Sequence, residues 1–155
     1  MALPKVGNKA PQFKGVDQNG DTIALADFKG KKIALYFYPH DNTPTCTDQA
    51  CNLRDNFALL AAKGIQVIGI SSDDSKSHKK FETKYSLPFP LIADTDLKIH
   101  EKYGVWQLKK FMGREFMGTI RTTFLIDEQG KLKHIIQKPV SKKHAAEILE
   151  QWGLL

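Results

Sequence analysis

Hydrophobic and polar positions along this chain follow two periods, one typical of buried strands and one typical of helices. Apolar runs at residues 33–38 and 65–70 predict strands that are buried on both faces of a sheet. Each run is followed by a segment with apolar residues at helical spacing, over residues 45–63 and 76–85. Gly64 is predicted to end the first of these helices. Strands that alternate with helices in this way predict a parallel arrangement of the two strands.

Shorter elements fill the rest of the chain. The dipeptide Asn19-Gly20 readily adopts the positive φ angles of a tight turn, so residues 13–25 predict an N-terminal β-hairpin that precedes the core. Residues 104–118 show no clear periodicity and are predicted to form a loop. The other predicted elements are a brief strand at 91–93, a helix at 96–103, a second hairpin from 121–126 and 131–137, and a terminal helix at 141–152.

This order of elements predicts a single α/β domain over residues 1–155. A chain of 155 residues with 41% hydrophobic content is long enough for one well-covered core and too short for two ordinary domains. The pattern resembles the thioredoxin-like fold, with a mixed central sheet flanked by helices and an N-terminal β-hairpin extension. Reactive groups in such sheets gather at the carboxyl ends of parallel strands, which is where residues 39–46 are expected to lie.

Composition and charge narrow the classes of function. The chain has 23 Lys+Arg and 17 Asp+Glu, a net charge of +6, but its basic residues are scattered without interleaved aromatic residues. We therefore expect a solvated surface and no nucleic-acid partner. No segment approaches the roughly 18 uninterrupted apolar residues of a membrane span, and the first residues lack a signal-peptide pattern, so a cytoplasmic protein without membrane contact is expected.

Both cysteines of the chain lie within a short segment, and their placement indicates redox chemistry or metal binding. Two cysteines are too few for the disulfide framework of a small secreted domain. Cys46 follows a Pro-Thr turn at the start of a predicted helix. The unpaired N–H groups and the positive end of the helix dipole favour a thiolate there, and the thiolate is the nucleophilic form of cysteine. Cys46 is therefore a candidate reactive residue.

Several motifs together resemble one family. The spacing Pro39-x3-Thr43-x2-Cys46 resembles the active-site motif of the peroxiredoxins, and Cys46-x4-Cys51 followed by Arg54-Asp55 resembles their bacterioferritin comigratory protein (peroxiredoxin Q) branch. Thr45 departs from this pattern, because the branch commonly has glycine before the catalytic cysteine. Three further segments look like that branch in order and spacing: Tyr36-Phe37-Tyr38-Pro39, Gly104-Val105-Trp106 and Arg121-Thr122-Thr123-Phe124-Leu125-Ile126-Asp127.

The resemblance implies a thiol-dependent peroxidase that reduces hydrogen peroxide and organic hydroperoxides to water and alcohols. Cys46 would be the peroxidatic cysteine, whose thiolate attacks the peroxide and becomes a sulfenic acid. Thr43 would orient the peroxide, Arg121 would favour the anionic sulfur and the developing charge, and Pro39 would shield the sulfur from water. Gln49, one helical turn after Cys46, is a further expected polar contact.

Cys51 would be the resolving cysteine, which forms an intramolecular disulfide with Cys46. Residues five apart in an ideal helix have Cα atoms roughly 8 to 9 Å apart. A disulfide requires less than about 7 Å, so the helix would have to unwind during turnover. The family resemblance implies thioredoxin as the reductant, with glutaredoxin as a substitute. It also implies no cofactor and no metal, and a monomer, although some members are dimers.

Two other classes of function stay open at this point. A metal-binding module would use Cys46, Cys51 and His40, although structural zinc usually has four ligands. A disulfide-exchange module on the same fold is the nearer alternative, although such proteins usually have two residues between their cysteines, in the motif Cys-x-x-Cys. The aromatic residues Tyr38, Trp106 and Phe111 are interpreted as packing residues rather than as part of the reactive site.

Overall fold

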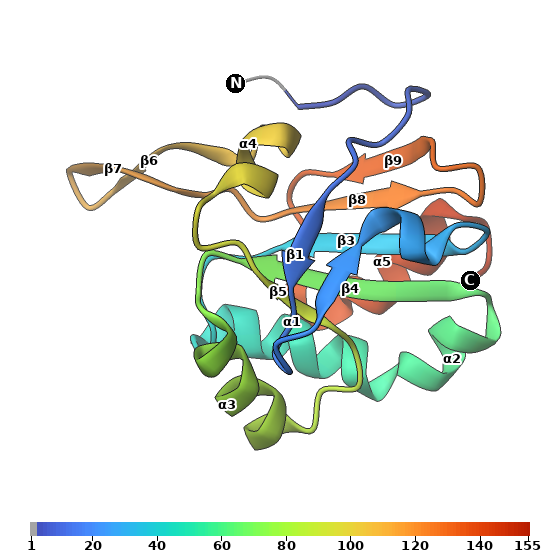
Figure 1. Cartoon of the computed structure of the whole chain (residues 1–155), viewed down its shortest axis with the longest axis horizontal. Helices are drawn as coiled ribbons and strands as arrows, with labels where there is room; N and C mark the ends of the chain where they lie inside the picture. The colour runs from blue at the N-terminus through green and yellow to red at the C-terminus, as the bar shows by residue number, and fades with distance from the viewer. Residues whose placement is uncertain (1–2) are drawn as a thin grey trace.

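A mixed seven-stranded sheet forms the centre of the molecule, with helices on both of its faces (Figure 1). The computed structural model describes residues 3–155. The strand order is β2-β1-β5-β4-β3-β8-β9, and β6 and β7 form a separate two-stranded sheet. Strands β3, β4 and β5 are parallel, whereas β8 runs antiparallel to β3 and β9 antiparallel to β8. This architecture is the thioredoxin-like fold that the sequence predicts.

The elements have the following bounds. The strands are β1 (Lys14–Val16), β2 (Thr22–Ala24), β3 (Lys32–Phe37), β4 (Ile65–Ser71), β5 (Leu91–Ala93), β6 (Trp106–Phe111), β7 (Arg114–Thr119), β8 (Thr122–Ile126) and β9 (Leu132–Ile136). The α-helices are α1 (Pro44–Asp55), α2 (Phe57–Ala62), α3 (Ser75–Tyr85), α4 (Lys98–Tyr103) and α5 (His144–Gln151). Two short 3-10 helices are η1 (Leu25–Phe28) and η2 (Ser141–Lys143). No helix among the residues described is long and apolar enough to cross a bilayer.

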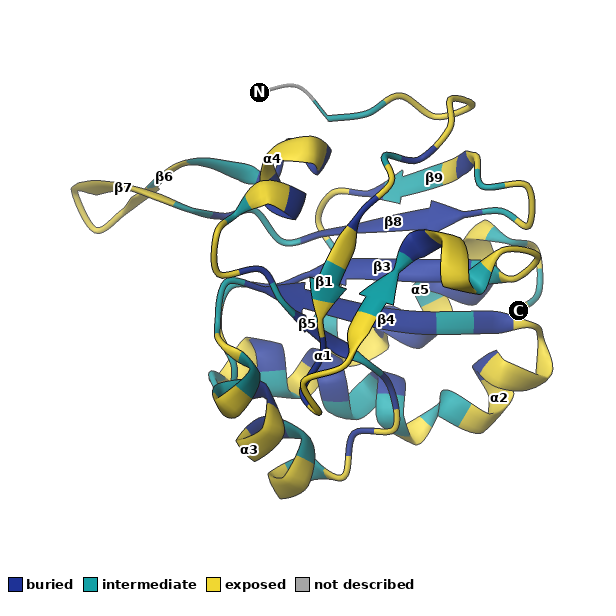
Figure 2. Cartoon of the chain, in the orientation of Figure 1, coloured by how far each residue is buried: buried dark blue, intermediate teal, exposed yellow. Residues whose placement is uncertain are grey.

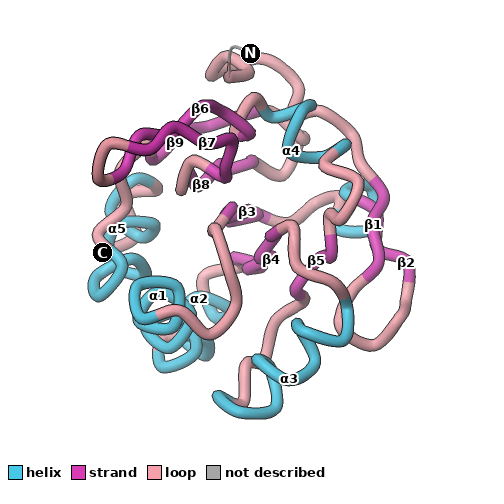
Figure 3. Tube along the Cα trace, turned by 90° about the vertical axis from the view of Figure 1, so that its left-hand side faces the viewer, coloured by secondary structure: helices cyan, strands magenta, loops and turns pink. Residues whose placement is uncertain are grey.

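Two hydrophobic clusters, one on each face of the sheet, make up the core. Alternate residues of β3 point to opposite faces, so that Ala34 and Tyr36 join one cluster while Leu35 and Phe37 join the other. The first cluster packs under α1, α2, α3 and α5, and the second under α4 and the N-terminal segment (Figure 3). Strands β3, β4 and β8 are almost entirely buried (Figure 2), which explains their continuous apolar sequences.

Most of the predicted elements are confirmed within a few residues, but the long helix at 45–63 is interrupted. Asn56 separates α1 from α2 with φ −107° and ψ 11°. Its side-chain amide donates to the carbonyl of Asn52 at 2.8 Å, a bond that competes with regular helix geometry. The N-terminal hairpin also belongs more closely to the core than the sequence suggests, because Val16 of β1 pairs with Ala93 of β5 at the edge of the sheet.

The prediction of a loop at residues 104–118 is wrong. This segment forms the hairpin of β6 and β7, which projects from the body of the molecule (Figure 1). Met112 and Gly113 make its two-residue turn, both with positive φ (51° and 78°). Most of its residues are exposed or half-buried on both faces, so the segment lacks the alternation by which a strand is recognised.

Close packing between β4 and its neighbours leads to a stability prediction. A Cβ atom on Gly69 would lie 2.9 Å from Leu91 Cδ2 and 3.0 Å from two ring carbons of Tyr36. Gly69→Ala should therefore lower the free energy of unfolding by about 1 to 3 kcal/mol in urea denaturation. The exposed substitution Lys80→Ala is the control, with an expected change within about 0.5 kcal/mol. Equal stability of Gly69→Ala and the parent would contradict this packing.

Candidate active site

The reactive segment lies at the carboxyl end of β3, where the chain turns into α1. Asn42 takes a left-handed conformation with φ 61°, and Pro44 occupies the first position of the helix, where its missing N–H costs nothing. Thr43 precedes the helix, and its carbonyl accepts from the N–H of Thr47 at 2.8 Å. Cys46 therefore lies in the first turn of α1, near backbone N–H groups that have no partner within the helix.

Arg121 reaches the sulfur from a distant part of the chain. Its Nη2 donates to Cys46 Sγ at 3.1 Å, and its Nη1 donates to Gln49 Oε1 at 2.7 Å. The sheet explains this contact: Phe37 pairs with Thr122, so Arg121 comes just before β8 at the level where β3 ends. Cys46 and Gln49 are three residues apart and therefore share one face of α1. Both arms of the guanidinium are thus held by the same helix.

Burial strengthens this contact. Cys46 is 2% exposed and Gln49 is fully buried. In such surroundings water screens charge weakly, so a permanently charged guanidinium stabilises an anionic sulfur more than it would in solution. Tyr36 lies fully buried in the same core cluster as Cys46. The pKa of Tyr36 is raised well above its usual value, mainly by burial and to a smaller extent by the nearby Cys46 and Asp41, so its hydroxyl stays protonated.

A hollow of about 350 Å³ opens beside this segment. Its lining residues are Pro39, His40, Ser72, Trp106, Lys109, Phe116, Met117, Gly118 and Thr119. The pKa of Lys109 is lowered, mainly by burial and to a smaller extent by the nearby positive charge of Arg121. The ammonium of Lys109 donates to the carbonyl of Thr119 at 3.0 Å. The sequence does not place Lys109 and Phe116 in the wall of this hollow, because the segment that holds them is predicted to be a loop. Gly113, which lies between two strand-like segments, is the one sequence signal that indicates a hairpin there.

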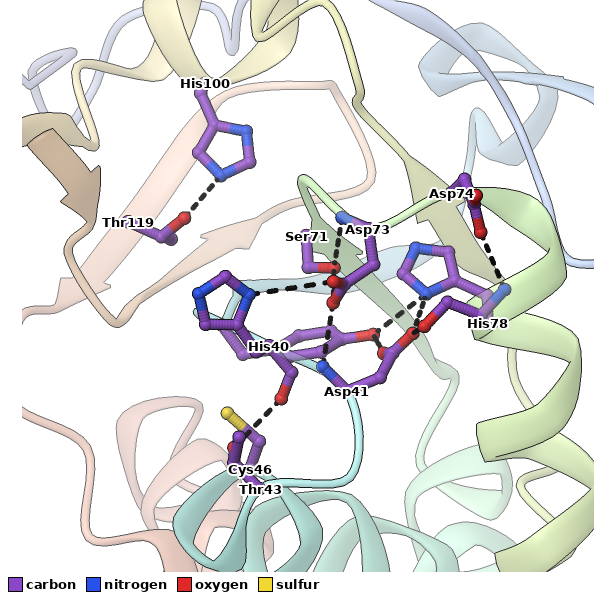
Figure 4. A network of polar contacts seen from close by, with 12 residues as sticks. His40, Asp41, Thr43, Cys46, Ser71, Asp73, Asp74, His78, His100 and Thr119 are labelled. Atoms are coloured by element: carbon purple, nitrogen blue, oxygen red, sulfur yellow. Dashed lines mark hydrogen bonds and ion pairs between the residues drawn. The ribbon is translucent and has the colours of Figure 1, made fainter.

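Thr43 and Pro39 shortly precede Cys46 in the sequence, and they make different contacts in the folded protein. The Thr43 hydroxyl donates to the carbonyl of His40 at 2.9 Å, which leaves its oxygen able to accept a hydrogen bond. Figure 4 shows the Thr43 and Cys46 side chains next to each other at the start of α1. Pro39 is half-buried and forms part of the wall of the hollow. Thr45 is exposed, so its replacement of the usual glycine leaves the buried sulfur undisturbed.

Cys51 lies on the same helix, and both cysteines are free thiols. Helix α1 continues without a break from Pro44 to Asp55, so an ideal geometry puts the two Cα atoms roughly 8 to 9 Å apart. Burial raises the pKa of the Cys51 thiol. The positive charge of Arg54 lowers this pKa in part, and the negative charges of Asp55 and Asp48 raise it further. Arg54 itself donates to Asp55 at 3.0 Å and to the carbonyl of Tyr85 at 2.9 Å, which ties α1 to the end of α3.

The metal-binding alternative does not fit the folded helix. Cys46 and Cys51 are about 140° apart around an ideal helix, so they cannot bind one ion while α1 is intact. Asp41, Asp73 and His78 form another group, with potential ligand atoms within 4.8 Å of one another. However, Asp41 Oδ2 and His78 Nδ1 are only 2.7 Å apart, which is a hydrogen-bond distance. We interpret this group as a hydrogen-bond network (Figure 4).

Comparison with known proteins identifies the family of this chain. Residues 6–135 match the AhpC/TSA family. Among curated proteins, the chain is 44% identical to peroxiredoxin Bcp of Bacillus subtilis over 94% of this chain and 93% of the relative. It is 41% identical to peroxiredoxin Bcp of Escherichia coli, again over 94% and 93%.

Solved structures show the same fold. A cysteine-to-serine variant of Xanthomonas campestris peroxiredoxin Q superposes with a TM-score of 0.88 and 26% identity, covering 97% of this chain and 98% of the other. BcpB of Mycobacterium tuberculosis gives a TM-score of 0.85 and 29% identity, covering 97% of each chain. The chain therefore belongs to the AhpC/TSA family, within its peroxiredoxin Bcp and Q group, and is a thiol-dependent peroxidase.

Proposed function

We propose that Cys46 is the peroxidatic cysteine of this peroxidase and that Arg121, Thr43 and Pro39 complete its site. The observation that carries the proposal is the 3.1 Å contact between Arg121 Nη2 and the buried Cys46 sulfur. Burial raises the pKa of the Cys51 thiol, which lowers its thiolate fraction while the helix is folded. Within residues 3–155, Cys51 has no guanidinium contact like that of Cys46, and we assign it the role of the resolving cysteine.

In the first step, the Cys46 thiolate attacks the terminal oxygen of the peroxide. A bond forms between sulfur and oxygen while the O–O bond breaks, and the leaving oxygen takes a proton to become water or an alcohol. The sulfur is oxidised to a sulfenic acid. Arg121 stabilises charge that develops along the O–O bond, and the Thr43 oxygen accepts a hydrogen bond from the bound peroxide. Pro39 excludes water from one side.

In the second step, Cys51 attacks the sulfenic sulfur and releases water, leaving an intramolecular disulfide. The geometry of α1 requires the helix to unwind between the two cysteines before this bond can form. Unwinding also exposes Cys51 to water and so removes the burial that raises its pKa. Thioredoxin, or glutaredoxin in its place, then reduces the disulfide and returns both thiols.

The hollow next to Pro39 indicates which substrates fit. Trp106, Phe116 and Met117 give its wall an apolar character that suits the organic part of a hydroperoxide. Hydrogen peroxide needs only the polar groups around the sulfur. We therefore propose that both classes of peroxide are reduced, by a monomeric cytoplasmic protein whose residues 1–155 act as one domain without cofactor or metal.

Substitution of the cysteines separates the two steps. Cys46→Ser should abolish peroxide consumption in an assay coupled to thioredoxin and thioredoxin reductase, because no other residue supplies the nucleophile. Cys51→Ser should consume about one equivalent of peroxide and then stop, because the sulfenic acid has no internal partner. Full thioredoxin-linked turnover by Cys46→Ser would contradict the assignment.

Unwinding of α1 can be measured by hydrogen exchange. Amides of residues 45–54 should be protected in the dithiol protein and should exchange much faster in the disulfide form. Helix α5 lies outside the segment that unwinds and provides an internal reference, because its amides should keep the same protection in both redox states. Equal protection of residues 45–54 in both redox states would rule out the unwinding step.

A further inference from the structure

The loop between β3 and α1, residues 38–43, carries Pro39 and Thr43 of the proposed site, and Asp41 holds this loop in place. The backbone N–H of Asp41 donates to Asp73 Oδ2 at 2.7 Å. The carboxylate of Asp41 accepts a hydrogen bond from the Tyr38 hydroxyl at 2.6 Å and another from the Ser77 hydroxyl at 2.8 Å. The ring of His78, on α3, completes this set with Nδ1 at 2.7 Å from Asp41 Oδ2 (Figure 4).

The hydrogen bonds of His78 fix how many protons the pair holds. Nε2 lies 3.0 Å from the carbonyl of Ile92, which can only accept, so Nε2 carries a proton. Nδ1 faces the Asp41 carboxylate, which also only accepts when it is ionised. The Tyr38 hydroxyl is 3.5 Å from Nδ1, but its proton is engaged in the much shorter bond to Asp41. A second proton must therefore lie between His78 and Asp41.

The other two buried histidines have no such requirement. His100 has Nδ1 at 2.6 Å from Asp94 and Nε2 at 2.9 Å from the Thr119 hydroxyl. His144 similarly has a carboxylate on one side and the Thr123 hydroxyl on the other. A hydroxyl can donate to the second nitrogen, so a neutral ring satisfies both sites. Among the buried histidines that the structure describes, His78 alone has acceptors that cannot donate at both nitrogens.

We propose that His78 is a buried imidazolium whose ion pair with Asp41 positions the loop for the reaction with peroxide. The side chain of His78 is fully buried and that of Asp41 is 4% exposed, so each charge depends on the other for compensation. The Tyr38 hydroxyl also donates to this pair. Its pKa is raised mainly by burial and then by the charge of Asp41, so it stays protonated and remains a donor. His78 acts through the loop and is a positioning residue.

The position of Asp41 explains why this pair affects one side of the site more than the other. Asp41 is two residues before Thr43 and two after Pro39, and the left-handed Asn42 links it to Thr43. The contact between Arg121 and Cys46 is built by α1 and the start of β8, outside this loop. Loss of the ion pair should therefore displace the groups that orient the peroxide while the sulfur keeps its guanidinium partner.

This inference rests on the proposed function, and the experiment separates the two. In a Cys51→Ser background, Cys46 is the single cysteine, and two second-order rate constants can be compared. Reaction with hydrogen peroxide needs an oriented substrate, whereas alkylation by iodoacetamide needs only an accessible thiolate. If Cys46 were not the nucleophile, the parent itself would fail the peroxide reaction, whatever residue 78 is.

His78→Gln keeps a donor for Ile92 and loses the contact with Asp41. We expect its rate constant with peroxide to fall about tenfold or more, because small displacements of orienting groups cost up to roughly 100-fold. Its alkylation rate should stay within about twofold of the parent. His78→Asn places an amide donor near the position of Nδ1 and should recover part of the peroxide rate. A His78→Gln protein that reacts with peroxide like the parent would overturn the proposal.

His100→Gln is the matched control, because it also removes a fully buried histidine that is paired with an aspartate. It should lower thermal stability without lowering the ratio of the peroxide rate to the alkylation rate. An equal fall of this ratio in His100→Gln and His78→Gln would reduce the role of His78 to general stability and refute the positioning role.

The charge state of His78 can be read in the unmodified protein, which makes the test independent of variants that fail to fold. In nitrogen-15 NMR spectra at neutral pH, both ring nitrogens of His78 should show the shifts of protonated imidazolium, whereas His100 and His144 should each show one unprotonated nitrogen. A spectrum in which His78 has one unprotonated nitrogen would overturn the ion pair.

Discussion

A guanidinium group 3.1 Å from a buried sulfur is the contact on which the rest of this structure depends. The two groups come from distant parts of the chain, one from the first turn of α1 and one from the residue just before β8. The antiparallel pairing of β3 with β8 brings them to the same edge of the sheet. Gln49 then holds the second arm of the guanidinium, so the charge stays aimed at the sulfur and not at solvent. In the proposed mechanism, the fold thus provides a fixed positive charge where the reaction develops a negative one.

In the proposed reaction cycle, the same helix has to satisfy two opposing requirements. An intact α1 presents Cys46 to Arg121 and keeps Cys51 apart from it, which suits the reaction with peroxide. A disulfide between the two requires that part of the helix be lost. Contacts at the far end of the helix, from Asn52 to the start of α5 and from Arg54 to α3, limit how far unwinding can spread. The helix is therefore anchored just beyond the segment between the two cysteines, which the proposed disulfide requires to open.

Much of the fold and of the reactive site could be predicted from the sequence, for definite physical reasons. The buried strands have continuous apolar sequences, and the motif around Cys46 combines a turn, a helix start and two cysteines in a spacing shared with one family. That resemblance also pointed to Arg121, which the periodic pattern alone would have treated as an ordinary charge at the start of a strand.

The features that escaped prediction depend on contacts that leave no local pattern. The β6–β7 hairpin is exposed on both faces, so its strands lack alternation and Lys109 could not be placed near the site. Asn56 interrupts a helix at a point where its side chain bonds the carbonyl of Asn52. The pairing of Asp41 with His78 joins a loop to α3 across the fold, and neither residue follows a recognisable spacing.

The most direct test of this account is the rate constant of Cys46 with hydrogen peroxide when Arg121 loses its charge. In a Cys51→Ser background, Arg121→Gln should slow the reaction by about 100-fold or more, the size expected when a fixed donor at a developing charge is removed. Circular dichroism would establish that the variant is folded. A folded Arg121→Gln protein that reacts within about twofold of the parent would contradict the central role of this contact.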